Sequence, residues 1–169
     1  MSRMLCGAGA LLILFLGACA ARRPLPAYEK PVARAPVLKV RTTAYTHSES
    51  DHKAYGARNA LGTPLKCGEV NSAAADWSRF PAGTVFRIAA TGEIYEVDDY
   101  GWMLSGTNTI DLYKPSRSAM NVWGVRRVTI EVLRWGDVAS SYRVLKPREE
   151  HRHVKRMVAQ IEDRFSEGG

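Results

Sequence analysis

Three aspartates stand among small or apolar residues in the middle of the chain, where a charged carboxylate is unfavourable unless it has a specific role. Asp76 follows three alanines, Asp99 ends a run of apolar and acidic residues, and Asp111 lies between Ile110 and Leu112. An apolar setting or a neighbouring carboxylate raises the pKa of an aspartate, which then can donate a proton near neutral pH. The pattern therefore indicates acid–base chemistry, above all at Asp111. The alternative for each aspartate is a hydrogen bond to backbone amides in a turn.

Period-two alternation predicts the strands that must position these carboxylates. Segments rich in β-branched and aromatic residues alternate in this way over 38–46, 84–90, 93–99 and 126–135. Turns rich in glycine and proline separate the segments. Several short strands with little helix predict a mainly β protein, built as a small barrel or sandwich.

Two helices are expected beside these strands. Ser116 is placed to cap a short helix over 117–122, which Gly124 can end. Apolar residues recur at helical spacing between 148 and 165, with charged residues on the opposite face. This spacing predicts a C-terminal amphipathic helix that packs on the barrel or lies free in solution. A helix that binds a protein partner is the alternative.

The first 18 residues have the composition of an export signal. Arg3 precedes the apolar run 11–16, which is shorter than the about 20 residues of a membrane span. Small residues then precede Cys19, as at a lipoprotein-processing site. We expect acylation of Cys19, which would hold the protein stably on a membrane, at the periplasmic face of the outer membrane. The alternative is an ordinary signal peptide cleaved near Ala20.

Composition divides the rest of the chain into three parts. Prolines in residues 19–37 predict an extended tether, 38–136 holds the predicted strands, and 137–169 is a C-terminal tail with a helix. The formal net charge of +7 suits an acidic partner, and export disfavours nucleic acid. Beyond the signal and Cys19, Cys67 is the one cysteine, so no intramolecular disulfide is expected. We expect Cys67 to be a small, partly buried residue; a nucleophile is the alternative.

Several separate motifs in order resemble the 3D domain, named for three aspartates, of bacterial cell-wall proteins. The matching motifs are Thr43–Thr46, Gly62–Leu65, Ala73–Asp76, Phe80–Thr84, Val97–Gly101, Gly106–Tyr113 and Trp123–Arg126. The resemblance covers the predicted strands but neither the tether nor the C-terminal helix. After the second aspartate, the family's usual Thr-Gly is replaced by the bulkier run 100–103, and Asp98 adds a carboxylate beside Asp99.

The resemblance implies a six-stranded double-psi β-barrel, similar to the catalytic domain of membrane-bound lytic transglycosylase A and to stationary-phase muralytic factors. Those enzymes cleave the β-1,4 bond between N-acetylmuramic acid and N-acetylglucosamine of peptidoglycan and leave a 1,6-anhydro sugar. By position, the resemblance implies that Asp111 is the catalytic acid, Asp99 its close companion and Asp76 the third member. The expected substrate-binding residues are Thr43, Tyr45, Tyr100 and Gly101. No cofactor is implied, since the aspartates lack the spacing of a metal-binding loop.

The expected reaction needs a single acid–base carboxylate. Asp111 would protonate the departing glycosidic oxygen and then take the proton of the sugar's own 6-hydroxyl, whose position is already largely fixed. Asp99 would keep Asp111 protonated through the coupling of like charges. Two alternatives stay open: a peptidoglycan-binding module that loosens glycan strands without cleaving them, and a structural envelope lipoprotein that recruits a partner through its C-terminal helix.

Overall fold

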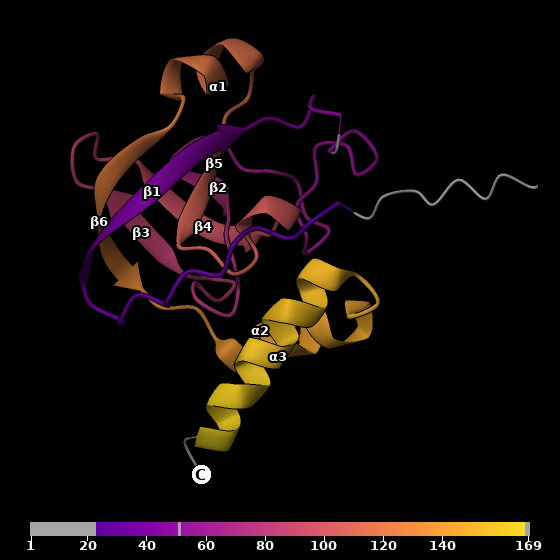
Figure 1. Cartoon of the computed structure of the whole chain (residues 1–169). Helices are drawn as coiled ribbons and strands as arrows, with labels where there is room; N and C mark the ends of the chain where they lie inside the picture. The colour runs from indigo at the N-terminus through magenta and orange to yellow at the C-terminus, as the bar shows by residue number, and fades with distance from the viewer. Residues whose placement is uncertain (1–22, 51, 168–169) are drawn as a thin grey trace, which may run out of the picture.

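A closed barrel of six strands forms the body of the protein, as the computed structural model shows (Figure 1). The strands are β1 (Val37–Tyr45), β2 (Val70–Ala74), β3 (Val85–Ile88), β4 (Ile94–Asp99), β5 (Thr109–Tyr113) and β6 (Arg126–Arg134). They close in the order β1-β5-β2-β4-β3-β6. The pairs β1–β5 and β2–β4 are parallel and the others antiparallel. The expectation of a mainly β barrel is therefore confirmed.

The structure describes residues 23–50 and 52–167. The predicted signal peptide and the predicted lipidation site Cys19 lie outside the described residues. Within the described ranges, no helix is long and apolar enough to cross a membrane.

Apolar side chains from all six strands fill the barrel interior. The fully or almost fully buried members are Val40, Ala73, Phe86, Ile88, Tyr95, Val97, Ile110, Leu112 and Ile130. Because successive side chains of a strand point to opposite faces, inward apolar residues alternate with outward ones along β6 and most of β1. This continuous core makes the barrel a rigid base for side chains at its rim.

Helix α1 (Arg117–Trp123) follows β5 and confirms the predicted short helix. The Ser116 side chain accepts a hydrogen bond from the backbone N–H of Ala119 at 3.2 Å and so caps the helix. Gly124 ends it with a φ of 62°, a left-handed conformation that suits glycine.

Two further helices, α2 (Val138–Leu145) and α3 (Arg152–Glu167), lie side by side beneath the barrel (Figure 1). The sequence did not predict α2. The Asp137 carboxylate caps this helix by accepting from the Ser140 N–H at 2.5 Å. The buried side chains of both helices join the same hydrophobic core as Trp77 and Phe80; they are Leu145, Val154, Met157, Val158 and Ile161. The C-terminal part of the chain is thus packed against the barrel.

Residues 23–36, here called the N-terminal segment, have no regular structure but lie along the barrel (Figure 1). The Glu29 N–H donates to the Gly106 carbonyl at 2.8 Å, and the Pro36 carbonyl accepts from Val132 at 2.7 Å. A guanidinium of α3, that of Arg156, donates to the Pro26 carbonyl at 2.8 Å. This part of the predicted tether therefore lies against the folded domain.

Candidate active site

Asp99 and Asp111 end up on strands that flank β2. Asp111 of β5 is paired with Thr43 of β1 on one side and with Ala74 of β2 on the other. Ala74 in turn is paired with Asp99 of β4. With neighbouring strands about 4.8 Å apart, the backbones of the two aspartates are separated by about 10 Å. The small Ala74 side chain between them leaves room for a ligand.

A β-bulge decides which of the two consecutive aspartates of β4 faces this side. The register between β2 and β4 shifts at Ala73, so that Asp98 is skipped and Asp99 is paired with Ala74. Asp99 lines the cavity described below, whereas Asp98 is not among its lining residues. Asp98 instead accepts from the Ser72 hydroxyl at 2.8 Å and lies 3.5 Å from the Lys66 ammonium. Asp99 is therefore the member of the pair that can meet a substrate.

Three donors hold the Asp99 carboxyl in place. The backbone N–H groups of Ala60 and Tyr100 donate to Oδ1 at 3.1 and 2.9 Å, and the Tyr45 hydroxyl donates to Oδ2 at 3.1 Å. Burial outweighs these bonds and, with the nearby charge of Asp98, raises the pKa of Asp99 to about 7. A carboxyl with such a pKa is matched to proton transfer near neutral pH.

Asp111 is the more accessible of the two carboxylates, being only partly buried. The Thr43 hydroxyl donates to its Oδ1 at 2.6 Å, which fixes the orientation of the carboxylate. Burial raises the pKa of the Tyr45 phenol well above its usual value, and the charges of Asp99, Asp98 and, more weakly, Asp111 add to this rise. Tyr45 therefore stays protonated and remains a hydrogen-bond donor at this site.

A cavity of about 700 Å³ contains both carboxylates, a volume within the range of roughly 300–1,000 Å³ that small-ligand sites occupy. Its aromatic lining consists of Tyr45, Tyr55, Tyr100 and Trp102. Aromatic faces offer flat apolar area, and the tyrosine hydroxyls add polar contacts. Such a lining suits a ligand with both apolar faces and hydroxyl groups. Of the predicted substrate-binding residues, Tyr45, Tyr100 and Gly101 line the cavity, while Thr43 reaches it through Asp111.

The C-terminal part of the chain supplies a wall of this cavity that the sequence did not predict. Arg148 and His153 line it together with His52 from the loop after β1. The His153 ring packs against Trp102, with 5.4 Å between ring centroids. Burial, and then the proximity of His151, lower the pKa of His153 to about 4, so the ring is neutral at physiological pH.

Arg148 links this wall to the carboxyl of Asp99. Its Nη1 donates to the Ala60 carbonyl at 2.9 Å and to the Tyr100 hydroxyl at 3.2 Å. Ala60 and Tyr100 are the two residues whose backbone N–H groups hold Asp99 Oδ1. Arg148 therefore contacts both residues whose backbone N–H groups hold Asp99, at the carbonyl of one and the side-chain hydroxyl of the other.

Trp77 connects α3 to the backbone of Asp99. Its indole N–H donates to the Asp99 carbonyl at 2.8 Å, and its backbone N–H donates to the Met157 sulfur at 3.4 Å. Its ring meets that of Tyr100 edge to face, with centroids 5.1 Å apart. Because Trp77 is fully buried among the apolar residues of α3, the helix supports the site from behind.

Asp76 lies apart from the other two aspartates, in the interior rather than at the cavity. Its Oδ1 accepts from the N–H and hydroxyl of Ser78 at 2.8 and 2.5 Å, and its Oδ2 accepts from the Gly106 N–H at 2.5 Å. Burial raises the pKa of Asp76, and these bonds oppose the rise. Asp76 thus joins the loop after β2 to the loop before β5.

Cys67 is exposed, so the expectation of a partly buried thiol is wrong.

Replacing Asp99 by asparagine is expected to stabilise the protein at pH 8 but not at pH 4. The asparagine Oδ1 can accept from Ala60 and Tyr100, and its amide can donate to the Tyr45 oxygen. The aspartate is disfavoured in its charged form, so wild-type stability falls as pH rises from the ordinary pKa of 3.8 through about 7. That shift corresponds to about 4 kcal/mol at most. Thermal melts across this pH range, with exposed Asp163→Asn as control, test it; an equal gain at pH 4 contradicts it.

Replacing Arg148 by alanine is expected to disturb the site more than the fold. The change removes the hydrogen bonds to the Ala60 carbonyl and the Tyr100 hydroxyl, so the two backbone donors of Asp99 can move while the Tyr45 hydroxyl still donates. We expect any turnover at this site to fall tenfold or more, with a shifted pH profile and a small decrease in Tm. Arg143→Ala, an exposed arginine of α2, is the control. Loss of kcat in parallel with folded fraction would mean that Arg148 only stabilises the fold.

Within the described residues, no group of three His, Cys, Asp or Glu side chains is arranged to hold a metal ion. No protein-family model matches the chain, and no curated protein matches it.

Proposed function

We propose that this protein is a peptidoglycan lytic transglycosylase of the 3D type. It would cleave the β-1,4 bond between N-acetylmuramic acid and N-acetylglucosamine with formation of a 1,6-anhydro sugar. The observation that carries the proposal is that Asp99 and Asp111 line one cavity together with several aromatic rings. The two aspartates come from the strands on either side of Ala74.

In the proposed reaction Asp111 acts first as acid and then as base. Its carboxylic proton passes to the glycosidic oxygen as the bond from that oxygen to C1 breaks, and the leaving sugar departs as an alcohol. The resulting carboxylate takes the proton of the 6-hydroxyl, whose oxygen bonds to C1 and closes the anhydro ring. Asp111 thereby regains its proton, and no water is consumed. Because the nucleophile belongs to the substrate, no second nucleophilic carboxylate is needed.

Asp99 and Thr43 prepare Asp111 for this role. The Thr43 hydroxyl orients the Asp111 carboxylate, at 2.6 Å. A negative charge on either aspartate raises the pKa of the other, so the pair retains a proton at higher pH than an isolated carboxylate. Burial and the charge of Asp98 raise the pKa of Asp99 to about 7, so this carboxyl holds a proton close to neutral pH.

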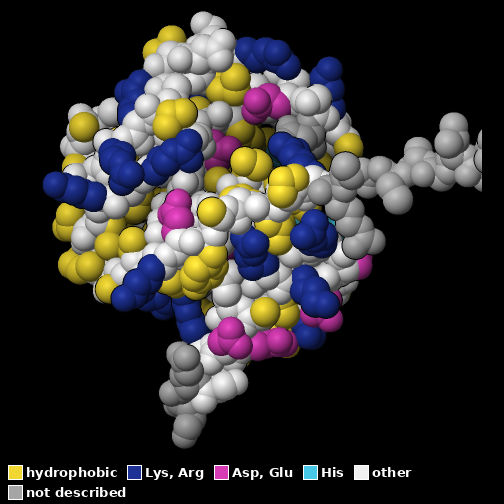
Figure 2. Space-filling model, in the orientation of Figure 1, with side chains coloured by type: hydrophobic (Ala, Val, Ile, Leu, Met, Phe, Trp, Pro, Cys, Tyr) yellow, Lys and Arg dark blue, Asp and Glu magenta, His cyan; other side chains and the backbone are white. Residues whose placement is uncertain are grey.

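The cavity walls support a saccharide as the ligand. The rings of Tyr100 and Trp102 offer faces on which pyranose C–H groups can pack, and Tyr45 offers a hydroxyl. Basic side chains are dispersed over the face shown in Figure 2, without one dominant positive patch. That distribution favours recognition within the cavity over a surface that binds a polyanion.

The proposal includes the finer features that the resemblance implies. The closed barrel with its two parallel pairs supports a double-psi arrangement. The buried row Val154, Met157 and Ile161 beside exposed Arg152 and Lys155 supports an amphipathic α3. Export, acylation of Cys19 and attachment to the periplasmic face of the outer membrane complete the proposal, so that the site meets the wall from the membrane side.

A non-catalytic peptidoglycan-binding lipoprotein is the second candidate function. Trp102 and Met103 both line the cavity, in place of the smaller residues usual in the family's loop, and Met103 is exposed. Bulky side chains at this position favour binding of a glycan strand in the cavity over its movement along the cavity during cleavage. The exposed side of α3 is then available to a protein partner.

Digestion of purified peptidoglycan tests the proposal. The chain from Ala20 onward, without lipid, is incubated with cell-wall sacculi, and the soluble products are identified by mass spectrometry. Anhydromuramyl ends are the expected result. Reducing ends instead would mean hydrolysis, with Asp99 activating water. No release, with the protein still bound to the pelleted wall, would favour the binding lipoprotein.

A further inference from the structure

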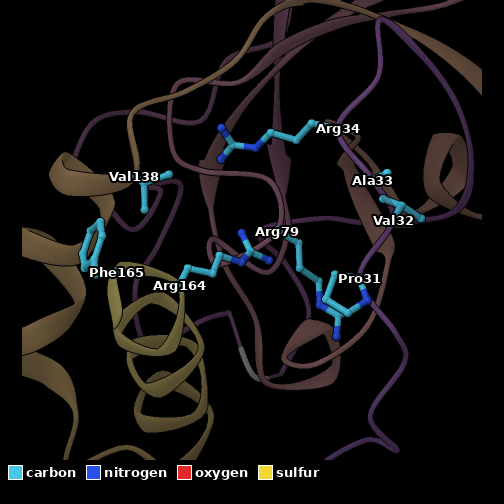
Figure 3. Close-up of a pocket in the computed structure, with 8 residues that line it drawn as sticks. All are labelled: Pro31, Val32, Ala33, Arg34, Arg79, Val138, Arg164 and Phe165. Atoms are coloured by element: carbon cyan, nitrogen blue, oxygen red, sulfur yellow. The ribbon is translucent and has the colours of Figure 1, made fainter. Parts of the chain in front are cut away.

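A second cavity lies between the N-terminal segment and the C-terminal end of α3 (Figure 3). Its volume is about 510 Å³, and it shares no lining residue with the cavity of Asp99 and Asp111. His153 lines the first cavity and Arg164 the second, so the two openings are separated along α3 by about 16 Å, at 1.5 Å per residue. The second cavity is therefore a separate place for a ligand.

Three arginines from distant parts of the chain line this cavity, and no acidic side chain of the described residues does. Arg34 comes from the N-terminal segment, Arg79 from the loop after β2, and Arg164 from α3. Partial burial and then the positive charge of Arg164 lower the pKa of Arg34, as expected for two guanidinium groups that lie close to each other. A cavity with this charge balance attracts an anion.

The available carboxylate partner is already engaged. Asp76 lies 3.8 Å from Nε of Arg79, but both of its oxygens accept shorter bonds from Ser78 and Gly106. The Arg79 Nε itself is buried, and its N–H has no hydrogen-bond acceptor within reach among the described residues. Within residues 23–50 and 52–167, neither Arg34 nor Arg164 forms an ion pair.

The guanidinium groups are held in place without an anion. Arg34 lies over the Trp135 ring, 4.9 Å from its centroid, and Arg164 donates to the Ser78 carbonyl at 2.5 Å. The guanidinium of Arg79 is fixed by Asn108 and by the Glu29 carbonyl. Figure 3 shows that Arg34 and Arg164 enter the cavity from different sides. An anion between them would meet donors that are already ordered, which lowers the entropic cost of binding.

The rest of the lining restricts the kind of anion. Val32, Val138 and Phe165 bring apolar surface to the same cavity. A planar guanidinium matches a carboxylate in two parallel hydrogen bonds, and aliphatic side chains match methyl groups. A carboxylate carried by a small aliphatic residue satisfies both parts of the lining, whereas a phosphate polymer would leave the apolar part uncovered.

We propose that this cavity binds the terminal carboxylate of an alanine-ended peptide stem of peptidoglycan. The proposal rests on the proposed function, which supplies a wall polymer whose glycan carries such stems. With the glycan in the first cavity and a stem carboxylate in the second, the protein would distinguish a stem with a free C-terminus from the donor stem of a cross-link, whose terminal carboxyl has become an amide. Arg34 and Arg164 would thus select the substrate that the aspartates cleave.

The test uses a synthetic stem pentapeptide without sugar, so that the first cavity is not involved. Its affinity for the soluble chain is measured by calorimetry, beside the same peptide with an amidated C-terminus. We expect the amide to bind at least tenfold more weakly. Arg34→Gln and Arg164→Gln are each expected to weaken binding of the free peptide at least tenfold, and exposed Arg143→Gln to leave it unchanged. Arg34 is exposed, so its variant is expected to keep the fold, and a thermal melt of each variant checks this.

The outcomes separate this proposal from the proposed function. Equal binding of acid and amide, or binding that neither arginine variant weakens, overturns the stem site even if the wall is digested. Tighter binding of inorganic phosphate than of the peptide also overturns it, since the anion is then not a carboxylate. Carboxylate-dependent peptide binding by a protein that fails to digest sacculi keeps the stem site and removes the transglycosylase.

Discussion

Asp111→Asn is expected to abolish release of anhydromuropeptides while the protein still binds the wall. Asparagine has the shape of aspartate, and its side-chain oxygen can still accept from Thr43, which lies 2.6 Å from Asp111 Oδ1. The fold and the cavity are therefore retained. Asparagine can neither give a proton to the leaving oxygen nor take one from the 6-hydroxyl, and both steps belong to the proposed reaction. Removal of a general acid–base group lowers rates by about 10²- to 10⁴-fold.

The measurement is mass spectrometry of soluble muropeptides together with a pelleting assay on the same sacculi. Asp163→Asn, on the exposed side of α3, is the matched control and should digest like the wild type. Retained activity in Asp111→Asn would transfer the acid role to Asp99, whose pKa of about 7 also suits it. Unchanged wall binding in an inactive wild type would leave Asp111 without a catalytic role.

The strands that the sequence predicted are those with one face inside the barrel and one outside. The alternation of β6 is of this kind, since its buried Ile130 stands among more exposed neighbours. β5 was harder to recognise as a strand from alternation because its residues are buried on both faces, with only Asp111 partly exposed. β2 consists largely of small and polar residues whose burial depends on β4 and β5.

The order of the motifs predicts that Asp99 and Asp111 share one site, and the structure brings both to one cavity. The same reasoning added Asp76, which lies in the interior instead. Sequence reasoning missed Arg148, because it stands in a run of charged residues that resembles any solvated tail. Its partner Ala60 is 88 residues away, and no local pattern encodes a contact of that range.

A chain that ends at Gly136 is expected not to fold cooperatively, although the predicted strands end before that residue. Removing α2 and α3 would expose the surface that five buried apolar side chains cover; they are Leu145, Val154, Met157, Val158 and Ile161. At about 1.5–3 kcal/mol for each such side chain, the lost burial is roughly 10 kcal/mol. This is comparable with the whole net stability of a domain, about 5–15 kcal/mol.

The same truncation removes the supports of the site, since Met157 holds Trp77 and Trp77 holds the Asp99 carbonyl. Circular dichroism and a thermal melt of residues 20–136, compared with 20–169, measure the effect. Met157→Ala in the full chain should lose about 2–5 kcal/mol, while Lys155→Ala on the exposed side of α3 should lose almost nothing. A truncated chain that melts cooperatively near the full-length Tm would make the barrel self-sufficient. The C-terminal helices would then be support for Asp99 alone, because the fold would stand without them.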